Sequence, residues 1–341
     1  MERKTNSVKW YILSFLALLA LAIWSTYLKE PDNNLHIFAF DVGQGDSLLL
    51  QKGDYQILVD GGPDNKVIAE LGKVMPIEDR KIEKVILTHP HADHLSGLIE
   101  VLKRYNVDEI KISGAKHTTG SYLDFLKTVK DKNIPTKVPK IGEVESVFDQ
   151  GKITYLWPDE SIGSQEDNLN NTSIVFRLNY GKFSALFPGD CEVECWQGII
   201  ADNKNLIANV TLLKVAHHGS KNGTDQEIAS IIRPKMAIIS LGKDNKFGFP
   251  HKKAMEVLQK TGADIYRTDL QGTIDISTDG ENWSGKRDIK YNFKKQVPIA
   301  SRKINLLSFR FFRQIYSDRH LYPANRLPEY KPLLSPTTRQ I

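Results

Sequence analysis

Three histidines and an aspartate crowd into six consecutive residues, His89-Pro90-His91-Ala92-Asp93-His94. The apolar, partly β-branched run 84–87 directly before them predicts a short buried strand. The run 95–102 after them predicts a helix. The cluster therefore stands where a strand ends, on the kind of loop that carries chemistry in layered α/β folds.

The residue types of this cluster indicate a metal site. Neutral imidazole and carboxylate together suit zinc and its borderline neighbours manganese and iron. Because alternate residues of an extended segment point the same way, we expect His89 and His91 to hold one cation. Asp93 and His94, on the following turn, then reach a second. A single loop histidine commonly serves only as a hydrogen-bonding residue, whereas four ligand-type side chains at this spacing predict metal binding.

The pattern His-x-His-x-Asp-His after an apolar strand resembles the signature of the metallo-β-lactamase fold hydrolases. Asp60-Gly61-Gly62, after a strand expected at 55–59, resembles the segment whose aspartate braces the metal loop. Phe187-Pro188-Gly189-Asp190 resembles the segment whose aspartate bridges two metals. The resemblance implies the four-layer αββα sandwich of that family, an α/β fold.

Three further runs narrow the resemblance to one branch: Asp41–Ser47, His217–Ser220 and Gly248–His251. Together they are similar to the hydrolase domain of the ComEC-like DNA-uptake proteins and their stand-alone relatives. That branch also includes secreted phosphodiesterases that cleave phosphocholine from wall polymers. The similarity covers about residues 35–285, which we therefore expect to form the hydrolase domain.

Two positions depart from the family pattern. Many members have a histidine between the first cluster and the bridging aspartate, but the run 168–173 contains none. Asn171 is then a candidate oxygen ligand or substrate contact, with a simple turn-forming role as the alternative. Phe249 stands where relatives usually have a histidine, so His251 supplies the only imidazole of that loop.

The two adjacent histidines differ in their expected roles. Neighbouring strand residues face opposite sides, so we expect His218 to be the ligand and His217 to contact the ligands or the substrate. His251 is a candidate proton donor or phosphate contact, with capping of the next helix as the alternative. Lys221 is a candidate contact to phosphate oxygens, although residues 221–224 also suit an ordinary turn. The remaining histidines are taken as ordinary: His36, His117 and His320.

The resemblance and the ligand types together imply two divalent cations, with zinc favoured over manganese or iron. The expected ligands are His89, His91, Asp93, His94, Asp190 and His218. Such a pair lowers the pKa of a shared water and polarises the scissile group, so hydrolysis is the expected reaction. Asp93, Asp190 and His251 are the expected catalytic residues.

The resemblance favours a phosphodiester substrate, either DNA or a phosphocholine-bearing wall polymer. A lactone or amide hydrolase of the same fold is an alternative. A non-catalytic, metal-stabilised module that binds nucleic acid is another. Charge does not decide between them, because the tail from Lys294 holds ten basic and two acidic side chains of the 46 and 41 in the whole chain. The preceding body is therefore slightly acidic and shows no general nucleic-acid surface.

The N-terminus predicts a membrane anchor. Residues 10–28 are uncharged and strongly apolar, which just reaches the length of a membrane-spanning helix. Basic residues in the segment 1–9 favour a cytoplasmic N-terminus, which would leave the hydrolase domain outside the cell membrane. A cleaved signal peptide, and hence a secreted protein, is the alternative. Residues 29–34 predict a short polar linker.

Two further features remain open. The tail 286–341 is basic and aromatic around 304–316, which suits an amphipathic helix on anionic lipid, an arm for single-stranded nucleic acid, or a disordered extension. Cys191 and Cys195 would lie one helical turn apart, where a disulfide is geometrically poor. Two small buried thiols are therefore favoured, with a soft metal-ligand role for Cys191 as the alternative.

Strands broken by helices, without a repeat of fixed period, predict two sheets flanked by helices. We expect strands at 35–41, 46–51, 55–60, 84–88, 109–113, 173–179, 183–188, 212–216, 236–240, 265–268 and 273–276, with further short strands in 136–157. We expect helices at 65–74, 95–105, 121–130, 191–201, 225–232 and 252–261.

Overall fold

A computed structural model describes residues 2–27, 33–76, 78–158 and 168–286, with the side chains of the first segment described from Lys9 to Leu21. The predictions for the tail beyond Lys286 lie outside the described residues. So do those for most of the linker at 29–34 and of the loop at 159–170.

Two β-sheets form the centre of the domain that follows the N-terminal helix. Sheet A has the strand order β15-β14-β1-β2-β3-β4-β5-β6, and sheet B has the order β13-β12-β11-β10-β9-β8-β7. The strands of sheet A are β1 Leu35–Ala39, β2 Leu48–Lys52, β3 Tyr55–Val59, β4 Lys81–Leu87, β5 Asn106–Ile112, β6 Thr136–Lys137, β14 Ile274–Thr278 and β15 Trp283–Lys286. Those of sheet B are β7 Val144–Val147, β8 Gly151–Trp157, β9 Val175–Tyr180, β10 Phe183–Phe187, β11 Leu212–Lys214, β12 Met236–Ile239 and β13 Asp264–Arg267.

Strand direction changes within each sheet. The hairpin from β2 to β3 is antiparallel, whereas β3, β4 and β5 run parallel to one another. In sheet B, β9 and β10 are antiparallel, and β10 to β13 are parallel. Parallel neighbours place their carboxyl ends at the same edge, so the residues that follow β3 and β4 are brought together in one sheet and those that follow β10 and β11 in the other.

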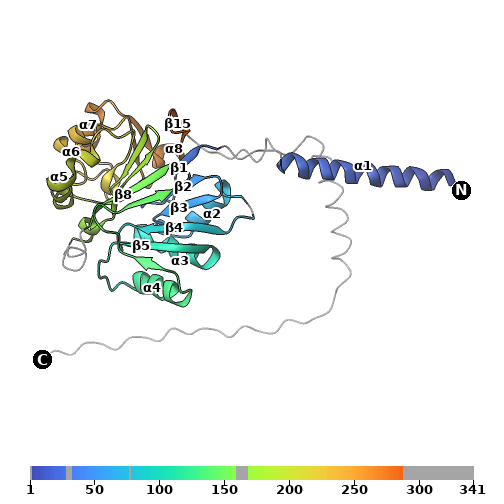
Figure 1. Cartoon of the computed structure of the whole chain (residues 1–341), viewed down its shortest axis with the longest axis horizontal. Coiled ribbons are helices and arrows are strands. Elements are labelled where there is room, and N and C mark those ends of the chain that lie inside the picture. The colour runs from blue at the N-terminus through green and yellow to red at the C-terminus, as the bar shows by residue number, and fades with distance from the viewer. Residues whose placement is uncertain (1, 28–32, 77, 159–167, 287–341) are drawn as a thin grey trace, which may run out of the picture. The chain divides into compact units, whose positions relative to one another are not determined.

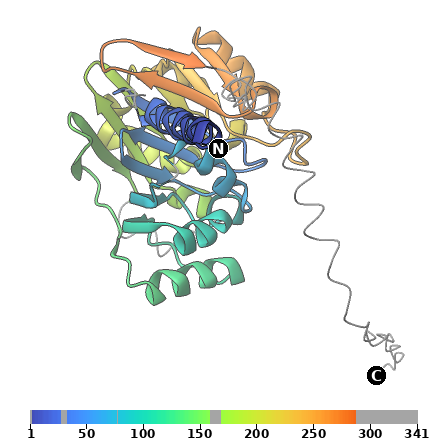
Figure 2. The ribbon, with the colours of Figure 1, turned by 90° about the vertical axis from the view of Figure 1, so that its right-hand side faces the viewer.

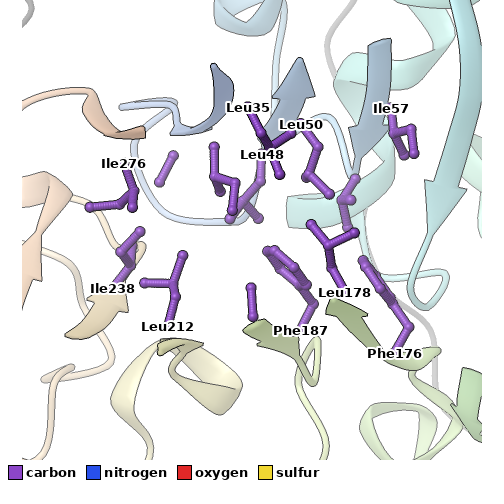
Figure 3. Packing of buried hydrophobic residues seen from close by; sticks show 14 of the residues in the cluster. Leu35, Leu48, Leu50, Ile57, Phe176, Leu178, Phe187, Leu212, Ile238 and Ile276 are labelled. Carbon is purple, nitrogen blue, oxygen red and sulfur yellow. The ribbon is translucent and has the colours of Figure 1, made fainter. Parts of the chain in front are cut away.

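The two sheets pack face to face through apolar side chains. Figure 3 shows leucine and isoleucine side chains of sheet A opposite phenylalanine, leucine and isoleucine side chains of sheet B. The labelled members, all buried, are Leu35, Leu48, Leu50, Ile57 and Ile276 on one side and Phe176, Leu178, Phe187, Leu212 and Ile238 on the other. Burial of this apolar area is the main force that holds the sheets together.

Helices cover the outer face of each sheet (Figure 1). Sheet A packs against α2 Lys66–Val74, α3 Ala92–Arg104 and α4 Gly120–Asp131. Sheet B packs against α5 Val193–Ile207, α6 Gln226–Ile232 and α7 Lys252–Lys260. In Figure 2 the teal and green helices α3 and α4 again lie side by side. The order helix, sheet, sheet, helix matches the layering that the sequence predicts.

Some boundaries differ from the predicted ones. Helix α3 begins at Ala92 rather than at residue 95, with His91 as its N-cap residue, so Asp93 and His94 lie in its first turn. The short helix α8 Thr268–Gln271 and strand β15 were not predicted. Strand β15 was missed because Trp283-Ser284-Gly285-Lys286 has little β-branched content, and its pairing with β14 comes from tertiary contact.

The cysteine prediction was wrong. Cys191 and Cys195 form a disulfide, with their Cα atoms 5.6 Å apart, and both residues are fully buried. The prediction assumed that both cysteines lie on one helix. Helix α5 begins only at Val193, so Cys191 lies in the non-helical segment before it and its side chain can reach Cys195. The alternative metal-ligand role of Cys191 is thereby excluded in the oxidised protein.

The N-terminal segment is a helix, α1 Glu2–Tyr27. Its described apolar side chains, from Trp10 to Leu21, are exposed. Within the described part of the chain, no helix combines the length and apolarity that crossing a bilayer requires. The membrane anchor predicted at 10–28 therefore remains a prediction.

Candidate metal centre

The predicted ligands follow three strand ends, and the aspartate predicted to brace them follows a fourth. Asp60 directly follows β3, and the histidine-rich loop follows β4. In sheet B, Asp190 comes shortly after β10, and His218 lies in the short 3-10 helix η2 Ala216–Gly219 after β11. The layered fold thus gathers residues that are far apart in the sequence.

Asp60 fixes the loop that carries the histidines. One carboxylate oxygen accepts hydrogen bonds from the Thr88 hydroxyl at 2.7 Å and from His94 Nδ1 at 2.8 Å, and the other accepts from the Thr88 backbone N–H at 2.8 Å. In the neutral form that binds a metal, His94 donates from Nδ1 to this carboxylate, and its Nε2 carries the lone pair and faces the interior of the site. The resemblance to the family predicted such a bracing role for this aspartate.

Four side chains converge in the interior. His94 Nε2 lies 3.3 Å from Asp190 Oδ2, and His218 Nε2 lies 3.4 Å from the same oxygen. Asp93 Oδ2 lies 3.3 Å from His218 Nε2 and 3.9 Å from His94 Nε2. Asp190 is therefore shared between the two imidazoles, and Asp93 lies close to both of them.

The donor atoms of this cluster fit a divalent cation. Among the described residues, His94 Nε2, His218 Nε2 and Asp190 Oδ1 are buried without a hydrogen-bond partner. Nδ1 of His218 donates to the Ser240 carbonyl at 2.8 Å, so in the neutral, metal-binding form its Nε2 also carries a lone pair. Buried polar atoms are nearly always satisfied, and an unsatisfied group of imidazole and carboxylate atoms is the arrangement that a metal ion completes.

The other two histidines of the loop meet at the edge of this cluster. His89 is fully buried, and its Nε2 lies 2.9 Å from His91 Nδ1. Its ring centre is 4.2 Å from that of His94. His89, His94 and Asp190 have ligand atoms that lie within 4.8 Å of one another, as do Asp93, His94 and His218. These two groups share His94, and two further groups combine Asp46 with Asp60 and His94 or with Asp190 and His218.

His217 and His218 lie in a turn rather than in a strand. Both have left-handed backbone conformations, with φ values of 46° and 52°. The premise that they alternate across a strand was therefore wrong, since β11 ends at Lys214. His218 points into the cluster, whereas His217 is half-buried, with Nδ1 2.7 Å from Glu192 Oε1 and Nε2 3.8 Å from Asp190 Oδ2. The assignment of His218 as the ligand stays a prediction.

Asn171 holds the segment that follows Asp190. Its side-chain oxygen accepts from the Glu192 backbone N–H at 3.1 Å, and its side-chain nitrogen donates to Glu194 at 2.9 Å. It is 1% exposed and lies in the 3-10 helix η1 Leu169–Thr172. Through these contacts Asn171 stabilises the segment that follows Asp190. Its predicted role as a ligand or substrate contact stays untested.

His251 and Lys221 lie outside the buried cluster. His251 is the N-cap residue of α7, but its side chain makes no capping hydrogen bond, so the capping alternative is not supported. Instead its Nδ1 accepts from the Lys221 backbone N–H at 3.0 Å. A neutral imidazole with this contact carries its proton on Nε2, which makes it a hydrogen-bond donor. Lys221 is exposed in a turn.

Two residues next to the cluster were missed by the sequence analysis. Lys214, at the end of β11, is 2% exposed, and its ammonium contacts the carboxylate of Asp46 and lies 3.6 Å from Asp190 Oδ1. Asp46 Oδ1 in turn lies 3.6 Å from His218 Nδ1. The available signal was a lysine inside the otherwise apolar run 212–216, because a buried charge requires a partner.

The charges of the cluster act on one another strongly. Burial opposes a charge on His218, yet Asp190 and Asp46 outweigh it and raise the pKa of His218 to about 10. Burial likewise opposes a charge on His94, while Asp190 and Asp60 raise its pKa well above the ordinary value. Against burial, His218 and His94 hold the pKa of Asp190 well below its usual range. The carboxylates therefore create a negative potential that favours a bound cation.

Comparison with known proteins agrees with this geometry. The profile of the Metallo-beta-lactamase superfamily matches residues 40–243, more than half of the chain. The chain belongs to this superfamily. Its members are generally hydrolases, and the matched segment contains every residue of the cluster described above.

The relatives of this superfamily member include "Competence protein ComA" of Neisseria gonorrhoeae, to which it is 24% identical over 269 residues, covering 76% of this chain and 35% of that protein. It is 30% identical over 254 residues to "ComE operon protein 3" of Bacillus subtilis, a match that covers 69% of this chain and 32% of that protein. It is also 30% identical over 242 residues to "Recombination protein 2" of Haemophilus influenzae, covering 70% of this chain and 28% of that protein. The predicted resemblance to ComEC-like proteins is confirmed. The chain spans about a third of the length of these relatives.

Among solved structures, the metallo-beta-lactamase fold protein YhfI of Bacillus subtilis aligns with 72% of this chain and 100% of its own. The sequence identity is 15% and the TM-score is 0.49.

Proposed function

We propose that this chain is a metal-dependent phosphodiesterase or nuclease. The observation that carries the proposal is the set of buried, unpartnered atoms on His94, His218 and Asp190, which converge from two sheets. The names of two relatives, "Competence protein ComA" and "Recombination protein 2", support a nucleic-acid substrate. Hydrolysis is the reaction that fits this site, since imidazole and carboxylate ligands are those of metallohydrolases.

The candidate ligands divide between two cations. His89 and His91 would hold one cation, and Asp93, His94 and His218 would hold the other, with Asp190 serving both. Zinc is the favoured ion, with manganese and iron as alternatives. When bound, such cations supply a water of lowered pKa and a positive charge opposite the phosphoryl oxygens.

The chain's own residues orient the candidate ligands and balance their charge. Asp60 holds His94 in one tautomer, and the Ser240 carbonyl does the same for His218. Lys214 balances part of the charge of Asp190 from the buried side. His251 presents an Nε2–H group, which would donate a hydrogen bond to an oxygen of the substrate. To donate a proton it would have to be an imidazolium, whose Nδ1 no longer accepts from Lys221.

We also propose that α1 anchors the protein in the cell membrane with the hydrolase domain outside. The described part of the helix exposes apolar side chains on every side, among them Leu13, Phe15 and Leu18. A helix that is apolar all round suits a lipid environment rather than water. The test is alkaline extraction of membranes from cells that produce the full chain, followed by protease treatment of intact spheroplasts. Release by alkali, or protection of the domain from protease, would overturn the proposal.

The activity test combines metal analysis with turnover of three substrates. We expect the purified full chain to bind a transition metal and to hydrolyse bis-p-nitrophenyl phosphate and single-stranded DNA, but not a chromogenic β-lactam. Asp190→Asn should abolish turnover while the circular dichroism spectrum is unchanged. β-Lactam turnover alone would instead identify an amide hydrolase. Bound metal without any turnover would identify a binding module, and absence of metal uptake would refute the proposal.

A further inference from the structure

An exposed aromatic side chain lies close to the metal centre, on the loop between β12 and α7. Phe247 is 52% exposed, and among described residues 33–286 no other phenylalanine, tyrosine or tryptophan is as exposed. Large aromatic side chains mostly pack in protein cores or contact a binding partner. Packing does not account for an exposed ring beside a catalytic centre.

A series of ring contacts links Phe247 to the cluster. The Phe247 and Phe249 rings are stacked, with centroids 5.6 Å apart and planes at 17°. Phe249 in turn contacts the ring of His217 at 5.4 Å and that of His218 at 6.1 Å. Phe249 is also the residue that replaces a histidine of the family pattern. Phe247 therefore stands one ring beyond a residue that touches both histidines.

The loop that carries these rings is held in place by hydrogen bonds. Asn245 accepts from the Phe249 backbone N–H at 3.0 Å and donates to the Phe249 carbonyl at 2.8 Å. The His251 backbone N–H donates to the Gly219 carbonyl at 2.9 Å, which ties the loop to the turn containing His217 and His218. An added Cβ at Gly219 would lie only 2.6 Å from Pro250. The rings are therefore positioned before any ligand arrives.

The charge around the rings is mainly positive. The ammonium of Lys246 lies 5.4 Å from the centre of the Phe247 ring. Lys243 is exposed on the same loop and Lys221 is exposed beside His251, whereas Asp244 provides the one negative charge within residues 242–251. Lys252, also exposed, pairs with Glu256 at 3.7 Å and adds no net charge. Lysines interleaved with stacked aromatic rings are the features with which proteins bind single-stranded nucleic acid.

We propose that Phe247 stacks against a nucleobase of a single-stranded nucleic acid whose phosphodiester lies in the metal centre. This inference rests on the proposed phosphodiesterase function and names the substrate class. A choline headgroup also binds aromatic rings, but through its positive charge. The Lys246 ammonium disfavours a second cation at the same ring and favours a phosphate beside it. The local charge thus selects a nucleotide over phosphocholine.

The test measures binding separately from turnover. The full, metal-loaded chain is titrated with a fluorescent oligothymidylate whose phosphorothioate links resist cleavage, and with an abasic strand of equal length. We expect Phe247→Ala to raise the Kd for oligothymidylate roughly 5- to 150-fold, and Phe247→Trp to retain or improve binding. Binding of the abasic strand should be the same in Phe247→Ala and the parent protein.

A second exposed apolar residue, distant in sequence from Phe247, provides the control. Val144→Ala, at an equally exposed apolar position on the edge strand β7, should leave oligothymidylate binding unchanged. An equal loss for the abasic strand, or no loss at all, would overturn the inference. So would a raised KM of Phe247→Ala for p-nitrophenyl phosphorylcholine with unchanged oligothymidylate binding. Failure of the proposed function looks different, because the parent protein would then turn over no phosphodiester even if the binding pattern holds.

Discussion

Nδ1 of His94 lies 2.8 Å from the carboxylate of Asp60, although the two residues are separated by 34 positions and belong to different elements. The contact joins the end of β3 to the first turn of α3. The contact fixes the orientation of the His94 imidazole, a candidate metal ligand. The geometry of the candidate site therefore depends on Asp60, which is not among the expected ligands.

Asp60→Asn should therefore weaken metal binding by about 10- to 100-fold, because removal of such a partner costs about that much affinity. The measurement is competition with a chromogenic chelator on the full chain. Asp64→Asn, at an exposed aspartate nearby, is the matched control and should not change the affinity. Equal affinities of Asp60→Asn and the parent protein would show that the bracing contact is irrelevant to the metal.

Lys214→Met should lower the free energy of unfolding of the metal-free protein by about 3 to 5 kcal/mol, as expected when one partner of a buried ion pair is removed. Lys214 and Asp46 are both at most 2% exposed. The double variant Asp46→Asn with Lys214→Met should lose less than the single variant, since no unpaired carboxylate remains at position 46. Urea unfolding in EDTA measures both, and equal losses would contradict the pairing.

Gly97→Ala should destabilise the protein and reduce metal binding. An added Cβ at Gly97, in α3, would lie 2.0 Å from the Gly61 carbonyl oxygen, so α3 would have to move away from the Asp60 turn. Gly72→Ala in α2 is the matched control because its Cβ would meet nothing within 4 Å. This second change should stabilise the protein by about 0.5 to 1 kcal/mol. Thermal unfolding and chelator competition distinguish the two.

The stability of the domain should decrease in acid through an ionic network between the sheets. Glu145 on β7 reaches across to Lys84 at 2.6 Å and to Lys111. Burial raises the pKa of Glu145, but the two lysines outweigh burial and lower it to about 2, against an ordinary value of 4.5. A depressed carboxyl pKa stabilises the fold above the unfolded-state value and ceases to do so as pH falls through the folded value.

We therefore expect the stability difference between the parent protein and Glu145→Gln, about 2 kcal/mol at pH 7, to shrink as pH falls from about 5 toward 2. Urea unfolding at several pH values provides the measurement. Glu281→Gln removes an exposed pair with Lys182 and should cost less than about 1 kcal/mol at any pH. A difference that is constant across the pH range would show that Glu145 is not the titrating group.

The sequence predicted the layers of the fold well because most elements bury a regular apolar pattern. Strand β4 and helix α4 follow directly from their hydrophobic periodicity. The start of α3 was misplaced because Ala92, Asp93 and His94 carry no apolar periodicity. The disulfide was missed for a related reason, since only the true start of α5 shows that Cys191 is outside the helix.

The sequence alone determined which residues are candidates for metal binding, because ligand-type side chains at strand ends are recognisable without coordinates. Tertiary structure decided how they are used. It placed His218 rather than His217 inside the cluster, brought the buried Lys214 to Asp46, and set Phe247 on the rim. These relationships depend on which strand ends face one another and on the charge balance of a buried space. Both arise only when distant segments pack, so no local pattern encodes them.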